Sequence, residues 1–169
     1  MASAKTAARR RAGRSRLVAA LRNYRPGDFN RLLEIDRACF REGIAYDEDE
    51  MRFYLRMPST TTLVAEESGA IRGFIIAHRL QQRRSSRFMG RIITIDVVPE
   101  GQHNGLGTLL LTSAEKELKQ AGCDHVVLEV AVDNEPALRF YKKHGYTVLK
   151  VLPNYYLDSV DGLTMGKRL

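Results

Sequence analysis

Alternating and continuous runs of apolar residues predict seven strands along the chain. The clearest is 92–98, where β-branched residues are nearly continuous, as in a central strand that is covered on both faces. Pro99 ends this strand because proline has no amide donor for a ladder. The other strand patterns lie at 17–24, 61–66, 71–80, 125–132, 146–152 and 163–169. The strands at 61–66 and 71–80 are predicted to form a hairpin, and 153–162 is predicted to be a loop.

Four segments have apolar residues at helical spacing. The first follows Asp28 as a cap, and the second follows Asp47, which forms a capping-box pattern with Glu50. The third runs to Gly122, and the fourth runs from a cap at Asn134 to a glycine at 145. The predicted apolar faces hold Leu32, Leu33, Ile35, Ala38 and Cys39 in the first helix, Met51, Phe53, Tyr54 and Leu55 in the second, Leu106, Leu109, Leu110, Ala114, Leu118 and Ala121 in the third, and Ala137, Leu138, Phe140 and Tyr141 in the fourth.

The order of these elements is β-α-α-β-β-β-α-β-α-β-β. Its central β-α-β unit requires a parallel pair of strands, because antiparallel neighbours need only a short turn. We therefore expect an α/β (α+β) fold, with a mixed central sheet of about seven strands and helices on both faces. At 169 residues the chain has the size of one domain.

Positive charge is concentrated at the start of the chain. The net charge is +7, and residues 1–16 hold six Lys or Arg and no acidic residue, so the rest carries about +1. We expect 1–16 to be a solvated, disordered arm and 17–169 to be the domain. Two alternatives remain for the arm. It could contact RNA or the ribosome, or it could be an organelle transit peptide. The Arg-rich segment 83–87 is expected to be an exposed loop.

The cysteines, the histidines and the hydropathy narrow the class of protein further. Cys39 and Cys123 form no CxxC pair, which favours structural thiols in a reducing compartment. The four histidines form no His-Glu-x-x-His pair, so no metal is expected. No apolar run approaches the ~20 residues of a membrane span. We expect a soluble, cytoplasmic protein that does not bind membranes, with its oligomeric state open and a monomer slightly favoured.

A glycine-rich turn joins the central strand to the third helix. Gly101, Gly105 and Gly107 allow the backbone to approach a ligand closely, and the first turn of a helix carries unpaired amides with positive dipole character. This pattern predicts a phosphate-binding site. It fits neither a Walker loop nor the dinucleotide motif Gly-x-Gly-x-x-Gly.

The turn at 102–107, Gln-His-Asn-Gly-Leu-Gly, resembles the Gln/Arg-x-x-Gly-x-Gly/Ala signature of the GCN5-related N-acetyltransferases. Segment 134–146 resembles the Asn-x-x-Ala-x-x-x-Tyr-x-x-x-Gly-Phe/Tyr segment of the same family. Two motifs in the correct order, with the expected helix and strand between them, are far more specific than either alone. The resemblance covers about residues 22–169. Segments 128–130, 153–156 and 161–165 are most similar to the N-terminal amine acetyltransferases typified by the ribosomal-protein-alanine enzyme.

The resemblance implies acetyl-coenzyme A as the acyl donor, and it implies where this substrate binds. The backbone of the central strand would pair with the pantetheine arm where that strand diverges from the strand at Glu129, as an added strand does. His103 replaces a residue that is often Arg in the family, which would weaken one contact to the pyrophosphate. The implied cofactor-binding residues are Ile95, Asp96, Val97, Gln102, His103, Asn104, Gly105, Leu106, Gly107, Thr108, Asn134 and Tyr141.

Two catalytic roles and one acceptor slot follow from the same resemblance. Glu129 is the implied general base, although by pattern alone a half-exposed strand carboxylate is the simpler interpretation. Tyr141 is the implied acid for the coenzyme A thiolate, with a core tyrosine as the alternative. Cys39 lacks a His-Asp context and is set aside as a nucleophile. The acceptor slot would be walled by Phe40, Tyr46, Tyr155 and Tyr156, unless these rings serve only loop packing.

The function that we expect is acetyl transfer from acetyl-coenzyme A to an amine through a ternary complex. The leading acceptor is the N-terminal α-amine of a protein, possibly of the ribosomal-protein class. One alternative is a small-molecule amine such as a polyamine or an antibiotic. The other is a non-catalytic acyl-coenzyme A-binding or RNA-associated module.

Overall fold

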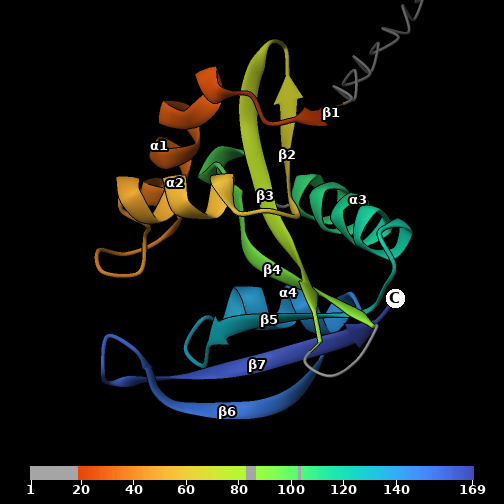
Figure 1. Ribbon diagram of the computed structural model, residues 1–169. Helices are drawn as coiled ribbons and strands as arrows, with labels where there is room; N and C mark the ends of the chain where they lie inside the picture. Colours follow the sequence, from red (N-terminus) through yellow and green to blue (C-terminus); the bar gives the residue numbers. More distant parts are fainter. Residues whose placement is uncertain (1–18, 83–86, 103) are drawn as a thin grey trace, which may run out of the picture.

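The computed structural model describes residues 19–82, 87–102 and 104–169. Seven strands and four α-helices follow one another there in the predicted order (Figure 1). The strands are β1 (Ala20–Asn23), β2 (Thr60–Glu67), β3 (Ala70–Gln81), β4 (Phe88–Val97), β5 (Cys123–Ala131), β6 (Thr147–Tyr156) and β7 (Val160–Arg168). The helices are α1 (Phe29–Cys39), α2 (Glu48–Arg56), α3 (Leu106–Gln120) and α4 (Glu135–Lys143), with short 3-10 turns at Pro26–Asp28 and Pro99–Gly101. Among the described helices, none has the length and apolarity needed to cross a bilayer.

The strands form one sheet in the order β1-β2-β3-β4-β5-β7-β6. Every neighbouring pair is antiparallel except β4 and β5, which are parallel because α3 carries the chain back between them. In Figure 1, β5, β7 and β6 run across the lower half of the molecule, at a large angle to the upright β2 and β3. The predicted mixed seven-stranded sheet is therefore confirmed, and it is strongly splayed at its centre.

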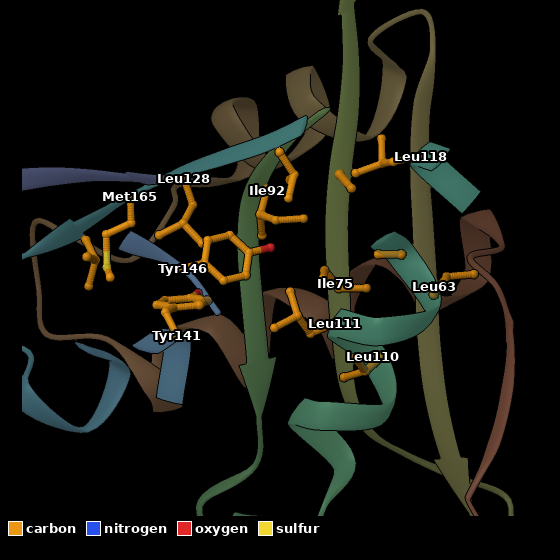
Figure 2. Packing of buried hydrophobic residues seen from close by; sticks show 14 of the residues in the cluster. Leu63, Ile75, Ile92, Leu110, Leu111, Leu118, Leu128, Tyr141, Tyr146 and Met165 are labelled. Atoms are coloured by element: carbon orange, nitrogen blue, oxygen red, sulfur yellow. The ribbon is translucent and has the colours of Figure 1, made fainter. Parts of the chain in front are cut away.

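Two apolar cores cover the two faces of the sheet. The core on one face joins α3 and the end of α4 to β2, β3, β4 and β5, and Figure 2 shows the rings of Tyr141 and Tyr146 inside it. The core on the other face joins α1 and α2 to β2 and β3. Alternation along β3 supplies both, since Ile75 faces the first core and Phe74 faces the second. Ala38, Phe53 and Ala121, which were predicted on apolar helix faces, are exposed.

The segment 153–162 was predicted as a loop, and this prediction is wrong. It forms the end of β6, a tight turn and the start of β7. Pro153 is tolerated because β6 is the edge strand of the sheet, and because the pairing with β7 shifts along this stretch where Asn154 has a φ of +51°. Leu157 and Asp158 make the turn with φ values of +53° and +54°.

Local capping signals were mostly predicted correctly. Asp47 and Glu50 form the capping box at the start of α2, and Asn134 caps α4 through its side-chain oxygen. Asp28 does not cap α1, because its carboxylate instead accepts from the guanidinium of Arg22 at 2.7 and 3.0 Å. The arm 1–16 and most of the Arg-rich segment lie outside the described residues.

Candidate functional site

The centre of the sheet has an open edge between β4 and β5. The two strands pair only from Phe88↔Cys123 to Arg91↔Val127, and no pair joins them beyond that point in the described chain. From there β4 continues only with β3, and β5 continues only with β7. We call residues 92–97 of β4 and 128–131 of β5 the open edge. Such an edge can bind an extended, amide-bearing molecule as an additional strand would bind, and the divergence that the family resemblance implied is confirmed.

Side chains already use some of the β4 carbonyls at the open edge. The carbonyl of Ile93 accepts from the Tyr46 hydroxyl at 3.3 Å. The carbonyl of Val97 accepts from Gln102 Nε2 at 3.2 Å and from Cys39 Sγ at 3.3 Å. Gln102 thus supports the strand at the start of the glycine turn.

Cys39 is a structural thiol. Burial, reinforced by nearby carboxylates, raises its pKa to about 12. A thiol with this pKa stays protonated at neutral pH and is a poor nucleophile. The raised pKa therefore supports the prediction that Cys39 is not a catalytic nucleophile. Cys39 and Cys123 are both free thiols.

The start of α3 fits an anion. Gly105 has a φ of +86°, and a Cβ built on it would meet nothing within 4 Å, so the space above it is open. The first helical bond runs from Leu109 N–H to the Gly105 carbonyl at 3.0 Å. The N–H groups of Leu106, Gly107 and Thr108 therefore point beyond the helix end, where the dipole favours negative charge.

The neighbours of this helix end give it a defined shape. Gly107 is close-packed, since a Cβ there would lie 3.4 Å from the Phe140 ring of α4. The Thr108 hydroxyl lies 3.1 Å from His144 Nε2. Asn104 is exposed in the turn, and His103 lies outside the described residues. The chain thus fits the pyrophosphate of acetyl-coenzyme A at this end of α3, although binding by each predicted residue remains a prediction.

Glu129 lies on the β5 side of the open edge and is paired with Arg91 of β4. Its Oε2 accepts from Arg91 Nε at 3.0 Å and from Nη2 at 2.9 Å. The Glu129 side chain is 18% exposed and that of Arg91 is 38% exposed, so water reaches the pair. Burial alone lowers the pKa of Arg91, but the Glu129 charge more than offsets it and the pKa is raised. The sequence analysis placed Glu129 among apolar neighbours only and missed this guanidinium.

Tyr141 comes to the site from α4 and is only 7% exposed. Its ring centroid lies 5.5 Å from that of Tyr146, and Figure 2 shows both rings in the core. Its hydroxyl forms no hydrogen bond within the described part of the chain. Burial, followed by the negative charge of Asp96, raises its pKa, so the hydroxyl keeps its proton at neutral pH. That is the form a proton donor needs, and the catalytic role itself remains a prediction.

Three of the four predicted aromatic residues come together beside the open edge. Tyr46, from the loop between α1 and α2, and Tyr156, at the end of β6, are close enough for their hydroxyls to interact electrostatically. Tyr155 packs edge-on to Tyr156 at 4.9 Å between ring centroids. Burial, the neighbouring Tyr155 and the Glu129 charge raise the pKa of Tyr156 to about 12. Tyr54 of α2, whose ring lies 5.1 Å from that of Tyr46, was not predicted for this site.

Phe40 is the exception among the aromatic residues. It ends α1, where its backbone N–H donates to the Asp36 carbonyl at 3.0 Å. No ring contact joins it to the tyrosines within the described residues.

The metal prediction is not contradicted, since the described residues contain no group of three or more His, Cys, Asp or Glu side chains arranged to hold an ion.

The sequence and the structure were compared with those of known proteins. The model of the acetyltransferase (GNAT) family matches residues 29–146. An N-alpha-acetyltransferase of Sulfurisphaera tokodaii is 31% identical over 159 residues, which cover 88% of this chain and 92% of that protein. The crystal structure of Ard1 from Thermoplasma volcanium has a TM-score of 0.79 at 27% identity, covering 89% of this chain and 97% of that one. The ribosomal-protein-S18-alanine N-acetyltransferase from Escherichia coli shares the fold, with a TM-score of 0.77 at 20% identity, covering 89% of this chain and 94% of that one.

Proposed function

The chain belongs to the acetyltransferase (GNAT) family, and on that premise we propose that it acetylates the N-terminal α-amine of a protein. It is an acetyl-coenzyme A-dependent N-acetyltransferase. The name of its Sulfurisphaera tokodaii relative, an N-alpha-acetyltransferase similar over nearly the full length of both chains, supports an α-amine as the acceptor. The observation that carries the proposal is the open edge, which has an uncapped helix end on one side and the Glu129–Arg91 pair with Tyr46 and Tyr156 on the other.

The donor substrate would occupy the helix end and the open edge. Amides at the start of α3 would bind its pyrophosphate, and the backbone of Ile95, Asp96 and Val97 would pair with its pantetheine arm. Acetyl-coenzyme A supplies an activated thioester carbonyl. A backbone amide of β4 directed at the thioester oxygen would stabilise the charge that develops there.

The acceptor would enter between Tyr46 and Tyr156. Glu129 would take a proton from its ammonium group, directly or through water, because the carboxylate lies at the open edge, pairs with Arg91 and is reached by solvent. Tyr141 would give its proton to the departing thiolate. Tyrosine rings on both sides would contact the first side chain of the peptide while their hydroxyls fix its backbone.

The acceptor class can be tested with three amines. A peptide with a free N-terminus should be acetylated at the α-amine, as located by tandem mass spectrometry. The same peptide with a blocked N-terminus and an internal lysine should not react, and neither should spermidine. Reaction of spermidine with the highest kcat/KM would overturn the α-amine proposal in favour of a small-molecule acceptor.

The role of Glu129 can be tested by Glu129→Gln. We expect kcat to fall by roughly 10²–10⁴-fold, with the KM for acetyl-coenzyme A unchanged and a smaller loss at high pH, where more amine is already neutral. Glu135→Gln is a matched control, because Glu135 also pairs with an arginine, Arg139 at 3.0 Å, but is exposed on α4. A loss in Glu129→Gln that is equal at every pH would assign this residue to substrate positioning instead.

A ribosomal protein is the finer acceptor that we propose. The support is compositional: the six Lys and Arg residues within 1–16, outside the described residues, would neutralise RNA phosphates. Such binding weakens steeply with salt. Acetylation of an intact ribonucleoprotein should therefore be salt-sensitive, while acetylation of a free peptide should not.

A further inference from the structure

Two carboxyl groups are buried against each other behind the open edge. Asp36 of α1 is 0% exposed and Asp96 of β4 is 1% exposed, and their carboxyl groups are close enough to act on each other's pKa. Asp36 Oδ2 also accepts from the Tyr46 backbone N–H at 2.7 Å, and Asp96 Oδ1 accepts from the Thr94 hydroxyl at 2.9 Å.

One proton held between the two groups would satisfy the other two oxygens. Asp36 Oδ1 and Asp96 Oδ2 have no donor among the described residues. Carboxylate oxygens are acceptors only, so a hydrogen bond between the two groups requires a proton on one of them. Both remaining acceptors are then satisfied, and the pair carries one negative charge in place of two.

The surroundings favour retention of that proton. Among the described residues, no cation bonds to either carboxyl group. Two charged groups act on Asp36: Glu50 of α2 raises its pKa and Arg37 of α1 lowers it. Burial raises the pKa of both acids, and the second carboxyl raises that of Asp96 further. The charge of the pair also raises the pKa of three neighbouring hydrogen donors, which are neutral at pH 7. They are Cys39 of α1, Tyr46 of the loop and Tyr141 of α4.

The pair also connects the two sides of the proposed site. Through Asp36 it holds the backbone of Tyr46, whose hydroxyl reaches the Ile93 carbonyl of β4. Asp96 itself belongs to β4. It lies between the Ile93 carbonyl, which accepts from Tyr46, and the Val97 carbonyl, which accepts from Cys39. Tyr46 is therefore tied to the donor strand at two points, by its backbone and by its ring.

We propose that the shared proton of Asp36 and Asp96 positions Tyr46 against β4, and that this positioning sets the affinity for the acceptor and not for the donor. When the pair loses the proton at alkaline pH, two adjacent buried anions repel each other and the Tyr46 loop moves away from the strand. Asp36 and Asp96 are positioning residues in this scheme. The proposal rests on the proposed function in one respect, namely that the acceptor lies beside Tyr46.

The kinetic test compares three variants with the wild type between pH 6 and pH 9.5. Asp36→Ala removes the acceptor of the Tyr46 N–H, and the acceptor KM should rise about tenfold at every pH while the acetyl-coenzyme A KM does not change. Asp36→Asn offers an amide oxygen to Tyr46 and an amide N–H to Asp96. It should restore the wild-type acceptor KM near pH 7 and abolish the alkaline rise that the wild type shows.

Glu115→Gln is the matched control. Glu115 is a buried carboxylate on α3 that bonds to Tyr146 and Lys167 on the opposite face of the sheet. Its variant should follow the wild-type pH profile of the acceptor KM. If Asp36→Asn also follows that profile, or if Asp36→Ala raises both KM values equally, the positioning proposal is overturned.

A second measurement separates this proposal from the acceptor class. The Tyr46 backbone amide can be followed by NMR without turnover, and it should be protected from exchange at pH 7 in the wild type and in Asp36→Asn but not in Asp36→Ala. Its protection in the wild type should fall as the pair loses its proton. If spermidine proves to be the best acceptor while these changes in amide protection persist, only the α-amine assignment fails. If the protection of the Tyr46 amide does not change with pH, the positioning proposal fails.

Discussion

The shared proton of Asp36 and Asp96 predicts how stability depends on pH. In the unfolded chain both carboxyl groups have ordinary pKa values near 3.9, so above about pH 5 they hold no proton. In the proposed scheme the folded protein holds one. An acid whose pKa is raised by folding favours the folded state at low pH, and this contribution is lost as pH rises. One extra bound proton lowers the free energy of unfolding by about 1.4 kcal/mol for each pH unit.

The variant Asp36→Asn removes this dependence while keeping the hydrogen-bonding pattern, because its amide oxygen accepts from Tyr46 and its amide N–H donates to Asp96. Between pH 5 and pH 8 its free energy of unfolding should gain about 4 kcal/mol relative to the wild type, from three pH units at about 1.4 kcal/mol each. Contributions of the opposite sign, such as Asp28, whose pKa is lowered by Arg22, are common to both proteins and cancel in the difference.

Urea unfolding at pH 5, 6, 7 and 8 measures this difference. Far-UV circular dichroism is the suitable signal, since the chain has no tryptophan. The m-values of the two proteins should agree, which verifies that the same surface is exposed in each case. A difference that stays constant across the pH range would refute the shared proton, because it would mean that folding takes up no proton at this pair.

Three further changes test the donor side and the chain boundary. Gly105→Glu should abolish acetyl-coenzyme A binding in calorimetry, because a carboxylate would occupy the open space at the end of α3; Gly105→Ala, which adds only backbone strain, should retain it. Tyr141→Phe should lower kcat at an unchanged acetyl-coenzyme A KM, and a wild-type kcat would remove its role as the acid. Deletion of residues 1–16 should leave peptide turnover unchanged, because both motifs follow Leu17; a crippled peptide reaction would place the arm within the catalytic domain.

Signals that lie close together in the sequence predicted structure well. The capping box of Asp47 and Glu50 spans one helical turn, and the glycines that end α3 and α4, Gly122 and Gly145, each have a φ of +88°. The order of elements along the chain followed from alternation and helical spacing, and the parallel pair followed from the length of the crossover. Pro153 misled the prediction because an edge strand tolerates a bulge there, and edge position is a property of the whole sheet.

The charged contacts of the site could not be predicted in the same way. Arg91 and Glu129 meet only because β4 and β5 are paired immediately before they diverge. Asp36 appeared as one more polar position on an amphipathic helix, and Asp96 as a residue within an apolar strand. The one available signal was Asp96 itself, since an unpaired carboxylate in a strand that is covered on both faces needs a partner or a proton.

The Glu129–Arg91 ion pair and the Asp36–Asp96 carboxyl pair differ in a way that separates catalysis from positioning. A general base must release each proton it takes before the next turnover, so it needs a path to water. Glu129, at 18% exposure and beside a guanidinium, has that path. Asp96, at 1% exposure, has none, and in the proposed scheme its proton is shared with Asp36. We therefore expect the proton of the amine to leave through Glu129, while the buried pair keeps its own proton throughout the cycle and holds the acceptor wall in place.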